Sequence, residues 1–96
     1  MKFELTVSFR ADLKRLGNEE HEIVRATLPD FVAAAETDAD DPSTKWPESL
    51  RVRDVENAPG ILEVTLNIAG PDIRATFEWT RIDGDLAVRW RRIGGP

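Results

Sequence analysis

The chain has 96 residues, of which 41% are hydrophobic and none is cysteine, and its formal net charge is −5. The length suits one domain with one hydrophobic core, the hydrophobic share argues against a disordered chain, and the lack of cysteine excludes disulfides and thiolate metal sites and favours the cytoplasm. The charge excludes a generic polyanion binder, because residues 1–44 carry five basic and ten acidic residues while residues 45–96 carry eight of each. A nucleic-acid surface would therefore be local and lie in the second half.

The amino-terminal region predicts a strand followed by a short helix. Residues 3–9 alternate apolar and polar side chains, a period of two that is typical of a half-buried strand. Leu13 and Leu16 then stand at helical spacing before Gly17, which favours the end of a helix. We expect neither a signal peptide nor a membrane span, because the start lacks an apolar core and no run reaches the roughly 18 apolar residues of a span.

A second helix is predicted over residues 18–37, where an apolar stripe follows three early acidic residues. Pro29 interrupts the stripe and predicts a kink or a split, because proline lacks the N–H that the helix needs. Residues 38–49 are rich in aspartate, serine and proline and predict a loop, with the acidic run as solvated surface.

The second half predicts strands separated by turns. Strands are expected, by alternation, at residues 50–55, 62–68, 73–79 and 86–90. Turns are expected at residues 57–60, 69–72 and 82–85. The element order is one strand, two helices and then three or four strands, written β-α-α-β-β-β for the four-stranded case, which predicts one α+β domain over residues 1–96. In it, two amino-terminal helices pack on one face of a four-stranded, mainly antiparallel sheet.

Strand parity predicts an open sheet face that is rich in arginine. The apolar residues at alternate positions of the predicted strands, including Trp79 and Trp90, are expected to pack under the helices. The opposite face collects Glu63, Thr65, Asn67, Arg74, Thr76, Glu78, Arg89 and Arg91, joined by Arg51 and Arg53. Two interpretations stay open at this point. The face is either a solvated surface of cross-strand salt bridges or an anion-binding surface, for which the arginine fork suits phosphate.

Histidine and tryptophan could have a functional role, but an ordinary structural role is also open to each. His21, the only histidine, lies among glutamates and is expected on the helix surface. Trp46 follows Lys45 in the predicted loop and either stacks on a base or packs over the sheet edge. Serine and threonine have no histidine partner, which excludes a hydrolase triad.

Five segments, in order, resemble the RelE/ParE toxin superfamily. They are residues 13–16 (LKRL), 45–53 (KWPESLRVR), 60–64 (GILEV), 74–77 (RATF) and 88–94 (VRWRRIG). The resemblance implies a small RelE-like fold and a type II toxin–antitoxin toxin that a cognate antitoxin neutralises. RelE-like members are metal-independent ribonucleases that cut mRNA in the ribosomal A site, whereas ParE-like members poison DNA gyrase. No cofactor, metal or membrane is implied.

The resemblance also implies a set of site residues. Arg74 matches the arginine that grips phosphate, and Glu48 loosely matches a general base. Arg91 or Arg92 matches a basic position near the end of the last strand, and parity puts Arg91 on the open face. The expected catalytic residues are Arg53, Arg74, Arg91 and Glu48. The expected RNA-binding residues are Lys45, Arg51, Arg89 and Arg92.

The sequence departs from the family pattern after the last strand. Family members usually continue with a His or Tyr that supplies the acid or a stacking ring, whereas residues 94–96 here are Gly-Gly-Pro and the chain has no tyrosine. Arginine is a poor acid because its pKa exceeds about 12, so we expect the acid role to be unfilled. Three hypotheses follow: a ribosome-dependent mRNA endoribonuclease, a ParE-like gyrase inhibitor, or a degenerate module that binds an antitoxin-like partner without toxicity.

Overall fold

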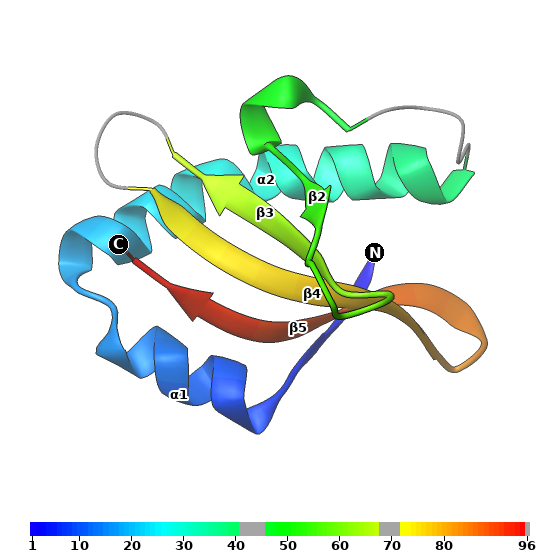
Figure 1. The fold of residues 1–96 in the computed structure, drawn as a ribbon, viewed down its shortest axis with the longest axis horizontal. Coiled ribbons are helices and arrows are strands. Elements are labelled where there is room, and N and C mark those ends of the chain that lie inside the picture. Colours follow the sequence, from blue (N-terminus) through cyan, green and yellow to red (C-terminus); the bar gives the residue numbers. More distant parts are fainter. Residues whose placement is uncertain (41–45, 68–71, 96) are drawn as a thin grey trace.

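The computed structural model describes residues 1–40, 46–67 and 72–95 (Figure 1). The chain forms an α+β structure with two amino-terminal helices, as predicted. No helix within the described ranges is both long and apolar enough to cross a membrane. The elements are β1 (Lys2–Leu5), α1 (Val7–Arg15), α2 (Asn18–Asp40), the 3-10 helix η1 (Glu48–Leu50), β2 (Arg53–Asp54), β3 (Leu62–Leu66), β4 (Ile73–Ile82) and β5 (Asp85–Gly94).

The sheet has five strands in the order β1-β5-β4-β3-β2, so the prediction of four strands was wrong. β1 pairs in parallel with β5, with Lys2 opposite Ala87 and Leu5 opposite Trp90, while the other neighbours are antiparallel. The sheet is therefore mixed. Alternation marks a segment as a strand but does not reveal its partner, and this parallel pair joins the two ends of the chain.

The first strand is shorter than predicted because Thr6 caps α1. Its hydroxyl oxygen accepts a hydrogen bond from the backbone N–H of Phe9 at 3.2 Å, and this turns the rest of the predicted strand 3–9 into helix. The Thr6 hydroxyl also donates to the carbonyl oxygens of Trp90 (2.9 Å) and Arg91 (3.0 Å). The start of α1 is thereby attached to the edge of β5, along which the helix then lies (Figure 1).

α2 is one helix from Asn18 to Asp40, so of the kink or split predicted at Pro29 the split is wrong, and the helix enters the predicted loop 38–49. Pro29 is exposed, as is Arg25 one turn earlier. The Arg25 carbonyl that loses its usual N–H partner can therefore bond to water instead, which reduces the cost of an internal proline.

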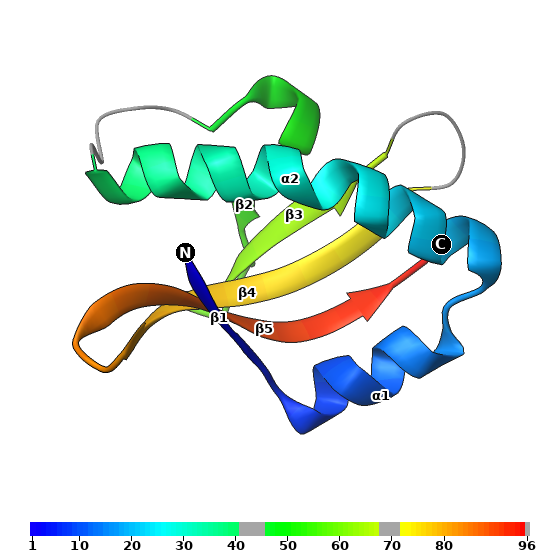
Figure 2. The ribbon, with the colours of Figure 1, turned by 180° about the vertical axis from the view of Figure 1, so that it is seen from behind.

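The core lies between the helices and one face of the sheet (Figure 2). α2 packs across β3 and β4, and α1 lies along β5. The prediction that the apolar side chains of the strands lie under the helices is confirmed for those that are buried, namely Val64, Leu66, Ile73, Ala75, Phe77, Val88 and Trp90. Trp79 is half-buried against the same cluster, and Ile68 lies outside the described residues.

The hairpin between β4 and β5 closes on Asp83 and Gly84, whose φ angles are 52° and 82°. A side chain at Gly84 would meet nothing within 4 Å, so only the left-handed backbone disfavours one. We expect Gly84→Ala to lower the free energy of unfolding by about 1 kcal/mol, measured by urea denaturation. Gly94→Ala is the matched control, because Gly94 also has free space but no positive φ. Equal destabilisation of both variants would contradict this account.

Candidate functional site

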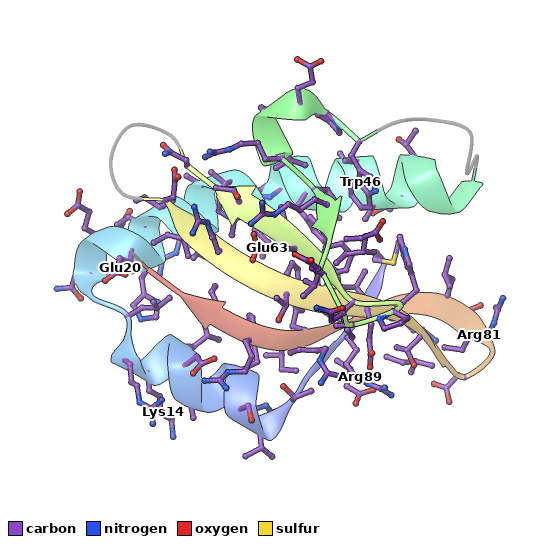
Figure 3. All side chains as sticks on the ribbon, viewed as in Figure 1. Lys14, Glu20, Trp46, Glu63, Arg81 and Arg89 are labelled. Atoms are coloured by element: carbon purple, nitrogen blue, oxygen red, sulfur yellow. The ribbon has the colours of Figure 1, made fainter. Side chains whose placement is uncertain are left out.

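The open face is the side of the sheet opposite α2, and it carries the arginines that parity predicted. Cross-strand pairs place Arg74 opposite Thr65, Thr76 opposite Glu63, and Glu78 opposite Arg89. Figure 3 shows Glu63 over the middle of this face and Arg89 near the hairpin end. The face therefore combines residues of β1, β2, β3, β4 and β5 that are far apart in the sequence.

A β-bulge changes the parity near the end of β5. Phe77 lies opposite Trp90 and Thr76 opposite Arg92, so Arg91 is the extra residue without a direct partner. The bulge therefore places Arg92 across from Thr76 in addition. Arg91 still reaches the open face, where its Nη1 is 3.4 Å from Glu78 Oε2.

Arg89 is bonded across three strands. It donates from Nη1 to Glu78 on β4 at 2.8 Å and from Nε to Glu4 on β1 at 3.1 Å. The hydrogen bond with Glu78, followed by that with Glu4, raises the pKa of Arg89. This arginine, proposed from sequence to bind RNA, thus has its guanidinium already engaged by two carboxylates.

Arg92 forms a two-pronged ion pair with Asp12 of α1. Its Nε and Nη2 lie 2.7 Å and 3.1 Å from the two carboxylate oxygens, and the backbone N–H of Ile93 donates to the same carboxylate at 3.1 Å. The bond from Arg92, followed by that from Ile93, lowers the pKa of Asp12. Sequence reasoning missed Asp12, whose only signal was a carboxylate on the inward side of a short amphipathic helix.

Arg51 and Arg53 are paired as well. Arg51 follows η1 in the left-handed conformation (φ 47°) and donates to Asp72 at 2.9 Å. Arg53 on β2 donates from Nε and Nη2 to Glu63 at 3.1 Å and 2.8 Å. A bond from the Asn67 amide and, next in size, that from Arg51 lower the pKa of Asp72.

Arg74 differs from the other five arginines of the open face. It is exposed, and no carboxylate within the described ranges forms an ion pair with it, although its charge attracts that of Asp72 at longer range. It borders a hollow of about 270 Å³ whose lining is Asp12, Glu63, Arg74, Thr76, Arg92, Ile93, Gly94 and Gly95. The six arginines and the five carboxylates that bond to them, Glu4, Asp12, Glu63, Asp72 and Glu78, together carry one net positive charge.

Of the remaining predicted residues, Glu48 and Trp46 are described. Glu48 is exposed at the start of η1, and no cation among the described residues pairs with it. Lys45 lies outside the described residues. Trp46 is half-buried, and its ring stacks on Phe31 at a centroid distance of 5.6 Å. Packing against the core, rather than stacking on a base, is therefore its role.

The arrangement can bind an anion at one point. Arg74 offers a guanidinium fork, Thr76 offers a hydroxyl on the same strand, and Arg92 also lines the hollow. In residues 1–40, 46–67 and 72–95, no three histidine, aspartate or glutamate side chains gather as a metal site. Comparison with known proteins found no matching family model, no similar curated protein and no similar solved structure. The resemblance to the RelE/ParE superfamily therefore rests on the five sequence segments.

Proposed function

We propose that the protein is a RelE-like toxin of a type II toxin–antitoxin system, acting as a metal-independent, ribosome-dependent mRNA endoribonuclease. Its partners on this proposal are a cognate antitoxin, the ribosome and mRNA, in the cytoplasm. The observation that supports it is the placement of Arg74, a guanidinium with which no described carboxylate forms an ion pair, beside a hollow on a helix-free sheet face. An RNA phosphate is an anion of the size and charge that such a fork binds.

Cleavage of this kind needs charge stabilisation and proton transfer. The ribose 2′-oxygen attacks the adjacent phosphate, a base takes its proton, and cations stabilise the negative charge that develops on phosphorus-bound oxygens. In this proposal Arg74 contacts the phosphate directly and Arg92 lines the same hollow, while Arg53 and Arg91 add positive charge elsewhere on the open face, held by their carboxylates. Glu48 is the proposed base.

A second candidate is a non-catalytic member of the same fold, either a ParE-like gyrase inhibitor or a module that binds an antitoxin-like partner. It is favoured by the state of the carboxylates on the open face, each of which is bonded to an arginine. The pKa values of Asp12 and Asp72 are lowered, whereas an efficient general base has a pKa near the working pH. The face thus supplies positive charge more readily than proton transfer.

The proposal is tested with Arg74→Ala. We expect loss of mRNA cutting on purified ribosomes and about tenfold weaker binding of a short single-stranded RNA, with a salt dependence reduced by about one phosphate contact. Arg81→Ala is the matched control, because it removes the same charge at the far end of β4 (Figure 3), where Arg81 donates to the Gly84 carbonyl. The fold of both variants is checked by urea denaturation.

The outcomes separate the candidates. Growth arrest on induction with mRNA cuts that disappear in Arg74→Ala supports the ribonuclease. Arrest without mRNA cuts, or no arrest at all, leaves the second candidate. If Arg74→Ala and Arg81→Ala weaken RNA binding equally, the hollow beside Arg74 is not the contact point and the site assignment is wrong.

A further inference from the structure

The two edges of the sheet differ in how they are protected from pairing with another strand. β2 at one edge is two residues long, and both of its residues, Arg53 and Asp54, are charged and exposed. Short, charged edge strands of this kind resist the addition of a further strand. β1 forms the other edge, is four residues long and includes the apolar residues Phe3 and Leu5. The β1 edge therefore lacks the protection of the β2 edge.

Some backbone groups of β1 face the open side of this edge. The N–H of Thr6 donates to the carbonyl oxygen of Trp90 on β5 at 3.2 Å. Because successive residues of a strand direct their N–H and C=O groups to opposite sides, the groups of Glu4 face β5 as the N–H of Thr6 does. Those of Phe3 and Leu5 face away from β5, where a further strand could pair with them.

Apolar side chains are exposed at the same edge. Among the residues that the structure describes, the large apolar side chains that are exposed are Met1, Leu5 and Val7, and Val7 is 85% exposed. Met1 and Leu5 share a face of the chain with Phe3, because they are two residues from it, and the Phe3 ring lies 6.2 Å from that of Trp90. Exposed apolar residues gathered at a strand edge mark an interaction site.

The opposite face of β1 carries one charge of each sign. Lys2 Nζ lies 3.1 Å from a carboxylate oxygen of Asp85, and Glu4 accepts a hydrogen bond from Arg89. The side chains of Lys2 and Glu4 are nevertheless partly exposed. β1 therefore presents apolar residues on one face and a basic residue followed by an acidic one on the other.

We propose that β1 pairs with β1 of a second copy of the chain, antiparallel and with Phe3 opposite Phe3, to form a symmetric dimer. This register places Lys2 opposite Glu4 of the second copy and Met1 opposite its Leu5. Each Phe3 can exchange N–H and C=O bonds with the other, because these groups face the open side. Opposite charges then meet on one face and apolar side chains on the other, and both kinds of cross-strand pair are stabilising.

Charge disfavours the neighbouring register. Centring the pair on Glu4 would place two carboxylates opposite each other, at a residue whose backbone groups face β5. With Phe3 at the centre the edge is complementary to itself, which favours a second copy over an unrelated strand. The contact is short, about 17 Å along residues 1–5. We therefore expect a reversible dimer with a dissociation constant of about 10 µM to 100 µM.

Charge reversal tests the register on the full chain. Lys2→Glu places acidic residues opposite each other, and Glu4→Lys places basic residues opposite each other. Each variant alone is expected to raise the dissociation constant of the dimer about tenfold or more. An equal mixture of the two variants restores opposite charges at both positions, so the mixed dimer should form with about the affinity of the parent. Sedimentation velocity over the micromolar range, with a fluorophore on one variant, measures both effects.

Two further variants complete the experiment. Leu5→Lys places a charge in the apolar row and is expected to weaken the dimer about tenfold, since an edge lysine opposes strand addition. Arg25→Glu makes the same charge change as Lys2→Glu at an exposed position of α2 and should leave the dimer unchanged. Urea denaturation of each variant shows whether its monomer is folded, and a restored mixed dimer requires that both partners fold.

The inference is overturned by a parent chain that stays monomeric throughout the micromolar range. In that case the β1 edge would be left to a strand of another polypeptide. A dimer that Lys2→Glu, Glu4→Lys and Leu5→Lys all leave intact would assign dimerisation to another surface. Folded variants whose mixture stays monomeric would exclude the register centred on Phe3. None of these readouts involves RNA, and the inference does not depend on the proposed function.

Discussion

Replacing Phe31 with alanine is expected to lower the free energy of unfolding by about 4 kcal/mol. Phe31 of α2 is fully buried, and its ring lies 4.8 Å from that of Trp90, 5.1 Å from that of Phe77 and 5.6 Å from that of Trp46. The truncation removes these aromatic contacts and leaves a cavity that three rigid rings cannot easily fill. The side chain thus connects α2, the sheet and the segment before η1.

Urea denaturation at neutral pH, followed by tryptophan fluorescence, measures the effect. Phe31→Leu keeps most of the volume and is expected to cost less than about 1.5 kcal/mol. Asp30→Ala, at the exposed neighbouring position of α2, is the surface control and should stay within about 0.5 kcal/mol of the parent. A loss below about 1 kcal/mol in Phe31→Ala would mean that the aromatic cluster is not the centre of the core.

Local patterns predicted the features of this fold that depend on neighbouring residues. Alternation located β3, β4 and β5 and divided their side chains into a buried and an open face, because the period of two is a property of the strand itself. The turn at Asp83 and Gly84 was predictable for the same reason, since glycine readily adopts the positive φ that the hairpin requires.

Features that depend on distant residues could not be predicted in this way. The alternation over residues 3–9 favoured one strand, but the bonds between Thr6 and the end of β5 made the second half of it helical. The parallel pairing of β1 with β5 and the bulge at Arg91 are likewise contacts between separate strands. The split at Pro29 does not occur, and the cost of an internal proline depends on whether water reaches the helix at that point.

The candidate site likewise combines features that local patterns predict with features that depend on distant residues. Parity correctly gathered the arginines onto one face, but it could not show which carboxylates would meet them. Glu4 and Asp12 pair with arginines that are 85 and 80 residues away in sequence. These pairs leave Arg74 as the arginine of the open face to which no described carboxylate is bonded, and that distinction comes from the three-dimensional arrangement.

Asp12→Ala is expected to lower the free energy of unfolding by about 2 to 3 kcal/mol. The Asp12 side chain is 7% exposed, and its removal leaves the N–H of Ile93, a residue that is 6% exposed, without its acceptor. Arg92 is 64% exposed, so its guanidinium can regain water, and this keeps the expected loss below that of a fully buried ion pair. β1 pairs with β5 only as far as Trp90. Beyond that point Asp12 supplies the acceptor that a neighbouring strand would otherwise offer to the N–H of Ile93.

The contribution of Asp12 should depend on pH in a defined direction. Its pKa in the folded protein is lowered from the ordinary 3.8, because Arg92 and Ile93 bond to the charged form. The stabilisation is therefore complete well above 3.8 and is lost as the pH falls through the folded pKa. Asp12→Asn keeps an acceptor for Ile93 but no charge for Arg92, so comparing it with Asp12→Ala separates the hydrogen bond from the ion pair. Urea denaturation at about pH 7 and about pH 3 should show the gap between the parent and Asp12→Asn shrinking in acid; a gap that stays constant would mean that the charge of Asp12 does not stabilise the fold.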